Sequence, residues 1–235
     1  MNEVSAIYGA PGNDLVVSGF TDPVPIVRID WDYFMARRQA ILAHSDLPPY
    51  LLLPEIQALI GHVLQADKHL LFNTLWHTGA RISEALTLTR ESFILDDPLP
   101  YVSIQTAKKR GRPKRGKQHP PRMVPITDPA YLRELASYFA SHPLKKGERL
   151  WPVTRQTAFR WTEQAVSSAV RQGQQFSIPI GPHTFRHSFA VNTVLHWIPI
   201  PALQAWLGHS RRESTEIYTQ VLSAETGHLM SRVEY

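Results

Sequence analysis

The chain has 235 residues, of which 43% are hydrophobic and 10% aromatic, and this is enough to bury one core of ordinary size. It contains no cysteine, which excludes disulfides and thiolate metal sites. There is no long apolar run and no secretion signal, so we expect a soluble, cytoplasmic protein. The 25 Lys and Arg outnumber the 20 Asp and Glu, which favours a polyanionic partner.

The first part of the chain, residues 1–50, is expected to be an N-terminal extension with one helix. Glycine and proline are scattered through its first half, and only residues 29–44 have a helical pattern. The extension is too short to form a second sizeable domain.

The rest of the chain is predicted to be mainly helical. A helix begins at Leu53 and Pro54, since proline suits the first turn. Two β-rich runs, 101–106 and 122–127, are predicted to form a hairpin. Further helical segments are predicted at 70–76, 81–88, 128–142, 154–172, 183–197, 201–209 and 211–222. The sequence therefore predicts an α+β fold that is mainly α.

The tip of the predicted hairpin is strongly basic. Residues 98–127 contain no acidic side chain. A charge run is most often a solvated loop, but Arg110-Gly-Arg112-Pro113 resembles an AT-hook, which favours the A·T-rich minor groove of DNA. Loose phosphate contact remains the alternative. The eight basic residues of this stretch are Lys108, Lys109, Arg110, Arg112, Lys114, Arg115, Lys117 and Arg122.

Residues suited to a phosphodiester site occur in four separate segments. A phosphodiester under attack gains negative charge, and the planar fork of arginine can bind its oxygens with two parallel hydrogen bonds. Taken singly, each residue has an ordinary explanation, such as a solvated arginine or a core tyrosine. The segments are Thr-Gly-Ala-Arg81, Lys108 in the hairpin, His183-Thr-Phe-Arg186, and Leu-Gly-His209 followed by Tyr218.

The order and spacing of these segments resemble the tyrosine recombinase (phage integrase) family. The sequences TGARISEAL, HTFRHSFA, LGHS and IYTQ each look like a family box. Arg186 precedes His209 by 23 residues (209 − 186), and His209 precedes Tyr218 by nine (218 − 209). The resemblance implies a catalytic domain at 51–222 with a small antiparallel, three-stranded sheet at one edge. The tail, 223–235, is expected to pack on a neighbouring subunit.

The resemblance also implies a role for each residue of a catalytic set. Tyr218 attacks the phosphate, which Arg81 and Arg186 bind. A lysine protonates the leaving 5′ oxygen, and Lys108 is preferred over Lys109. His183 is implied as a general base or phosphate ligand, and His209 as a hydrogen-bond donor. The expected DNA contacts of the hairpin are Lys109, Arg110, Arg112, Lys114, Arg115 and Lys117.

A zinc site is a weaker interpretation of the same residues. His183 and His187 are spaced i and i+4, but Thr184 stands where the HEXXH signature requires glutamate. We expect no metal, no ATP and no other cofactor. His119, His187 and His196 are interpreted as structural histidines.

The predicted function is that of a site-specific DNA recombinase acting through a 3′-phosphotyrosine intermediate. An inversion switch and a plasmid or transposon resolvase both fit this function. The resemblance implies four protomers on two DNA sites. An accessory DNA-bending protein is expected as a further partner. The helix of residues 1–50 is at most a reduced DNA clamp. The alternatives are an inactive DNA-binding accessory or regulatory protein of the same fold and a type IB topoisomerase.

Overall fold

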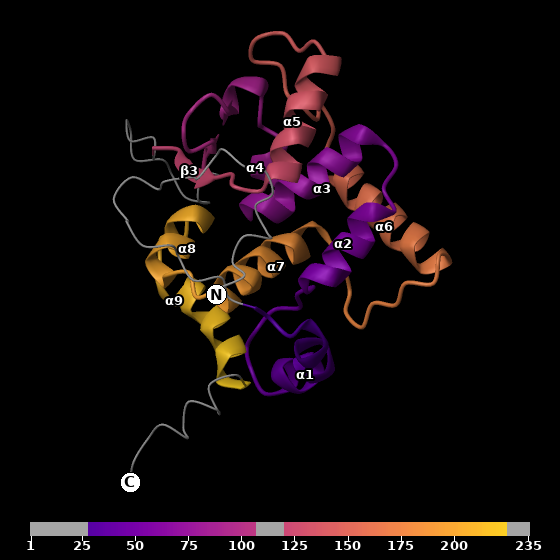
Figure 1. The fold of residues 1–235 in the computed structure, drawn as a ribbon, viewed down its shortest axis with the longest axis vertical. Helices are drawn as coiled ribbons and strands as arrows, with labels where there is room; N and C mark the ends of the chain where they lie inside the picture. Colours follow the sequence, from indigo (N-terminus) through magenta and orange to yellow (C-terminus); the bar gives the residue numbers. More distant parts are fainter. Residues whose placement is uncertain (1–27, 107–119, 225–235) are drawn as a thin grey trace, which may run out of the picture.

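The computed structural model describes residues 28–106 and 120–224, which form a mainly helical fold with a small sheet (Figure 1). This confirms the predicted fold class. None of the helices in these two ranges is both long and apolar enough to cross a membrane.

Most predicted helices are present, with shifted ends. The helix predicted at 70–76 runs from 66 to 78, and the one predicted at 81–88 already ends at Ala85. The segment predicted as one helix at 211–222 is a short α-helix followed by a 3-10 helix. The α-helices are α1 (Trp31–Ala43), α2 (Leu53–Gly61), α3 (Ala66–Thr78), α4 (Ile82–Ala85), α5 (Pro129–Ser141), α6 (Arg155–Arg171), α7 (Pro182–Leu195), α8 (Ile200–Leu207) and α9 (Glu213–Glu216), and the 3-10 helices are η1 (Arg90–Ser92) and η2 (Ile217–Ala224).

The sheet is antiparallel, with strands in the order β1 (Phe93–Ile94), β2 (Tyr101–Ile104) and β3 (Arg122–Pro125). Val102 pairs with Val124, and both side chains are buried. The alternation of buried and exposed residues along β2 and β3 places one face of the hairpin on the core. The two-residue strand β1 was not predicted from its sequence, because it is too short for a period-2 pattern.

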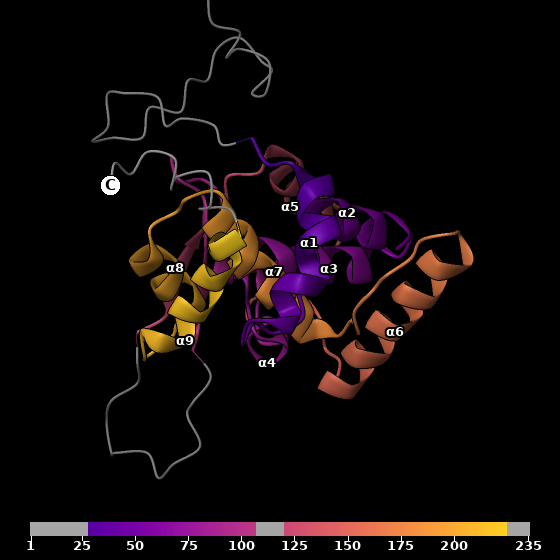
Figure 2. The same ribbon diagram turned by 90° about the horizontal axis from the view of Figure 1, so that it is seen from below.

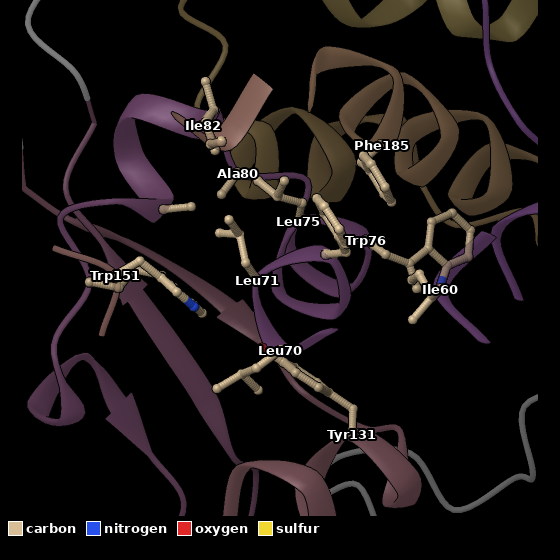
Figure 3. Packing of buried hydrophobic residues seen from close by; sticks show 14 of the residues in the cluster. Ile60, Leu70, Leu71, Leu75, Trp76, Ala80, Ile82, Tyr131, Trp151 and Phe185 are labelled. Carbon is tan, nitrogen blue, oxygen red and sulfur yellow. The ribbon is translucent and has the colours of Figure 1, made fainter. Parts of the chain in front are cut away.

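The larger core surrounds α3, which packs against α7 (Figure 3). Leu70, Leu71 and Leu75 of α3 are completely buried. Phe72 stacks on Phe185 of α7 with their ring centroids 5.4 Å apart. This packing fixes α7, which crosses the middle of the molecule between α6 on one side and α8 and α9 on the other (Figure 2).

A second core joins α1, α7, α8 and η2. Phe34 and Ile41 of α1 are buried in the same cluster as Tyr218 of η2. In addition, the buried Arg38 of α1 forms an ion pair with Glu55 of α2. The described part of the extension thus belongs to the core that surrounds Tyr218, whereas its role as a DNA clamp stays a prediction.

Glycine is required at the end of α3. Gly79 caps the helix with φ 58°, a left-handed conformation that side chains adopt at a cost. A Cβ atom built there would lie 2.4 Å from Cδ1 of Phe189. The chain therefore turns sharply at Gly79, and this turn determines the position of the residues that follow it.

Replacing Gly79 with alanine should lower the free energy of unfolding by roughly 2–4 kcal/mol, because backbone strain and a steric clash add. Urea denaturation measures this change. Gly61→Ala is the matched control, since a Cβ at Gly61 meets no atom within 4 Å and its φ is not positive; it should leave stability unchanged or slightly raised. Equal losses in the two variants would contradict the argument.

Candidate active site

Arg81 lies directly after this turn, at the N-cap of α4. Its backbone N–H donates to Oε2 of Glu84 over 2.9 Å, and its guanidinium donates to Oε1 of the same carboxylate over 3.1 Å. About a third of the Arg81 side chain is exposed. The guanidinium is therefore oriented by Glu84 while it keeps open positions for a ligand.

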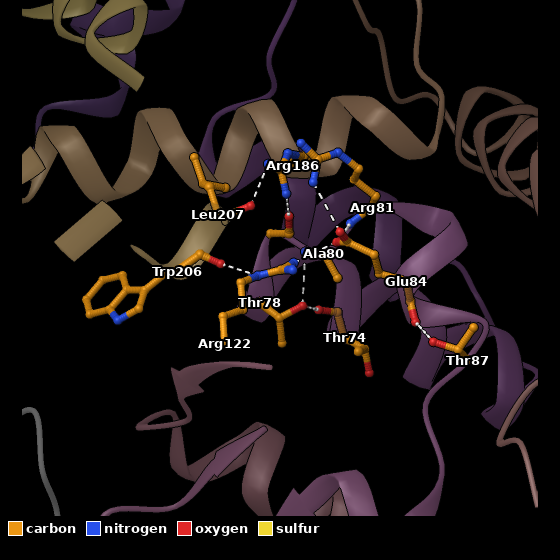
Figure 4. Close-up of polar contacts among 11 residues, drawn as sticks. Thr74, Thr78, Ala80, Arg81, Glu84, Thr87, Arg122, Arg186, Trp206 and Leu207 are labelled. Carbon is orange, nitrogen blue, oxygen red and sulfur yellow. Dashed lines mark hydrogen bonds and ion pairs between the residues drawn. The ribbon is translucent and has the colours of Figure 1, made fainter. Parts of the chain in front are cut away.

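Glu84 is shared with a second arginine, Arg122 of β3 (Figure 4). Arg122 donates from Nη2 to Oε2 of Glu84 and from Nε to the carbonyl of Trp206, each over 2.6 Å. Burial alone would raise the pKa of Glu84, but the hydrogen bond and charge of Arg122, together with Arg81, lower it to about 2. Glu84 is thus ionised at neutral pH. In the sequence Arg122 is only one of the hairpin's basic residues, whereas in the structure it is buried and ties β3 to α4 and α8.

Arg186 of α7 is nearly inaccessible, at 3% exposure. It donates from Nη1 to the carbonyl of Gly79 over 2.6 Å and from Nη2 to the carbonyl of Leu207 over 2.8 Å. Burial, followed by the nearby charge of Arg81, lowers the pKa of Arg186 to about 9, which still leaves it charged at neutral pH. Arg186 therefore joins the turn before Arg81 to the end of α8.

His209 follows the left-handed Gly208 at the end of α8. Its Nδ1 lies 2.9 Å from Oγ1 of Thr215. Burial, and then the charges of Arg186 and other nearby cations, lower the pKa of His209 to about 4. The imidazole is therefore neutral at physiological pH and able to donate one N–H to a ligand.

His183 lies in the first turn of α7, and its side chain is exposed. Partial desolvation of the ring lowers its pKa, and the charges of Arg186, Arg155 and Arg81 act in the same direction. Within 28–106 and 120–224, His183 has no hydrogen-bond partner, so both ring nitrogens are free there to meet a ligand or to accept a proton.

Tyr218 is 3% exposed, and its hydroxyl contacts His187 of α7. Its Oη lies 2.8 Å from Nδ1 of His187. Burial raises the pKa of Tyr218, while Arg186 and Arg81 act in the opposite direction. The interpretation of His187 as a purely structural residue therefore missed this contact. Its position one helical turn after His183 was the available signal, because residues at i and i+4 share a helix face.

The described residues thus bring Arg81, His183, Arg186, His209 and Tyr218 into one electropositive neighbourhood, although they come from the N-cap of α4, from α7, from η2 and from the residues after α8. The lysines Lys108 and Lys109 and the other hairpin contacts (Arg110, Arg112, Lys114, Arg115 and Lys117) lie outside the described residues. No three His, Asp or Glu side chains within the described ranges gather as metal ligands would.

The charges of this neighbourhood suit an anion. Three guanidiniums, from Arg81, Arg122 and Arg186, are close to a single buried carboxylate, Glu84. Desolvation, followed by the excess positive charge, lowers the pKa values of the nearby histidines. Such a cluster can bind a phosphodiester and stabilise the extra charge that it acquires under attack by a nucleophile.

Comparisons with known proteins show the family of this chain. The family model "Phage integrase family" matches residues 50–225. A resolvase of Escherichia coli is 39% identical over 218 residues, which cover 85% of this chain and 84% of the resolvase.

Two solved structures are similar in fold. The catalytic domain of bacteriophage HP1 integrase has a TM-score of 0.53 and 26% identity, and the match covers 79% of this chain and 99% of that domain. The XerH site-specific recombinase bound to its difH substrate has a TM-score of 0.59 and 22% identity, over 78% of this chain and 55% of XerH. The family model covers most of the chain and the resolvase match spans most of both proteins, so this chain belongs to the phage integrase family of tyrosine-type site-specific recombinases.

Proposed function

We propose that this chain cleaves and rejoins DNA strands through a 3′-phosphotyrosine intermediate formed on Tyr218. The observation that carries the proposal is the position of Tyr218: it lies on η2, which packs against α7, the helix that carries Arg186, and the charges of Arg186 and Arg81 oppose the rise of its pKa on burial. A phenol has a pKa of about 10 and needs such surroundings to act as a nucleophile.

In the proposed reaction, Arg81 and Arg186 bind the non-bridging oxygens of the scissile phosphate. His209 donates a further hydrogen bond to them, and His183 accepts the phenol proton when the hydrogen bond of Tyr218 to His187 is exchanged for one to His183. The Tyr218 oxygen bonds to phosphorus as the bond from phosphorus to the 5′ oxygen breaks, and Lys108, or alternatively Lys109, protonates that oxygen. The reverse steps rejoin the strand. Because the phosphotyrosine conserves the energy of the broken phosphodiester bond, the reaction needs no ATP.

The partner proposed is double-stranded DNA with specific sites, and this is supported by the DNA complex of the structurally similar XerH. Four protomers on two sites and an accessory DNA-bending protein remain part of the proposal. Similarity to a resolvase favours resolution over inversion. Plasmids with two sites in direct or inverted orientation distinguish these outcomes, since resolution excises the segment and inversion reverses it.

A nicked suicide substrate from DNA next to the protein's own gene tests the chemistry. With EDTA present, a covalent complex should appear on denaturing gels, and mass spectrometry of its proteolytic fragments should find the nucleotide adduct on the peptide that contains Tyr218. An adduct on another residue, or cleavage that leaves a free 3′ end and no adduct, would contradict the proposal.

A further inference from the structure

The contact between Tyr218 and His187 has no role in the reaction described so far. Oη of Tyr218 and Nδ1 of His187 are 2.8 Å apart, while the two ring centroids are 6.0 Å apart with an interplanar angle of 40°. The rings thus meet through their polar atoms and do not stack. The contact joins α7 to η2, two elements that pack closely together.

The direction of this hydrogen bond follows from the surrounding charges. Burial and the neighbouring His183 and Arg186 lower the pKa of His187 to about 4, so its imidazole is neutral and one ring nitrogen is an acceptor. The guanidiniums of Arg186 and Arg81 attract the negative end of the Tyr218 oxygen and repel its proton. A phenol that donates to Nδ1 of His187 satisfies both conditions, because its oxygen lone pairs are then left for the arginines.

We propose that His187 is a positioning residue: Nδ1 accepts the hydrogen bond of Tyr218 and thereby holds the phenol oxygen turned toward the phosphate-binding arginines before DNA is cleaved. This inference rests on the proposed function of Tyr218 as the nucleophile. The 3-10 helix that carries Tyr218 follows a four-residue helix, α9, and the apolar core around its ring can limit where the ring lies but not where its O–H points.

Orientation of a nucleophile has a large effect on rate, since an error of about 1 Å costs on the order of 100-fold. Loss of the His187 contact should therefore slow formation of the covalent complex while DNA binding is retained. His187 differs in this from Arg81 and Arg186, whose loss removes contacts to the phosphate itself.

Three variants at this position separate orientation from other roles. Asn carries Oδ1 on the same Cγ position at which His carries Nδ1, so His187→Asn keeps an acceptor in place but cannot be protonated. His187→Gln moves the amide one bond further from the backbone, and His187→Ala removes the acceptor. The readout is the single-turnover rate of covalent complex formation on the suicide substrate, with the dissociation constant for DNA and the Tm measured in parallel.

We expect His187→Ala and His187→Gln to be slower than the parent by roughly 10- to 100-fold, and His187→Asn to be within about fivefold of it. All three should bind DNA as the parent does. An asparagine variant as slow as the alanine variant would overturn the inference, as would an alanine variant as fast as the parent. The unmutated parent protein separately tests the proposed function. If the parent forms no covalent complex, the role of Tyr218 as the nucleophile is contradicted.

Discussion

Tyr218→Phe is expected to form no covalent complex with the suicide substrate, because phenylalanine has no oxygen to attack phosphorus. The ring remains the right size for the core that surrounds it. The variant loses the hydrogen bond to His187, which should lower the free energy of unfolding by only about 1 kcal/mol. Denaturing gels measure the covalent complex, and an electrophoretic mobility assay should show DNA binding close to that of the parent.

Tyr50→Phe is the matched control for this experiment. Tyr50 is completely buried in the same core, and its hydroxyl has no hydrogen-bond partner within the described residues. Removing this hydroxyl should therefore leave both the fold and the covalent complex intact. A complex that persists in Tyr218→Phe would exclude Tyr218 as the nucleophile.

Arg122→Met is expected to destabilise the protein by about 3–5 kcal/mol, because it removes the main partner of the buried carboxylate of Glu84. In a chain of this size, such a loss lowers the Tm by on the order of 10 °C. The variant also releases the carbonyl of Trp206, which lies just before Gly208 and His209. We therefore expect cleavage to decrease even at temperatures where the variant is folded.

The acid stability of the parent protein tests the same ion pair. The pKa of Glu84 in the folded protein is about 2, below its usual 4.5, so its contribution to stability is complete above pH 4.5 and disappears as the pH falls towards 2. Arg122→Met should weaken this dependence on pH.

An exposed ion pair provides the comparison for Arg122→Met. Arg212 and Glu216 are in contact on the surface, with 69% and 45% of their side chains exposed. Glu216→Gln should change the free energy of unfolding by less than about 1 kcal/mol. If Arg122→Met lowered the free energy of unfolding as little as Glu216→Gln, the buried ion pair between Arg122 and Glu84 would not be what holds β3 to α4.

The sequence by itself determined the helical composition, the basic hairpin and the family of this protein. Amphipathic periodicity indicates helices because it depends only on neighbours along the chain, and it located α5, α6 and α7 to within one or two residues. Helix ends were less accurate, since the left-handed turn at Gly79 and the change to a 3-10 helix at Ile217 depend on tertiary packing. The spacing of the polar boxes indicated Arg81, His183, Arg186, His209 and Tyr218 as site residues, and their catalytic roles stay predictions.

Only the tertiary structure decided how these residues hold one another. The local sequence around Arg122 is that of a basic strand and does not reveal that its charge is buried against Glu84, 38 positions earlier. Likewise, His187 is one of 11 histidines, and its contact with Tyr218 exists because α7 packs against η2. Burial and long-range hydrogen bonds depend on which distant segments meet, and this is a property of the folded chain that no local pattern contains.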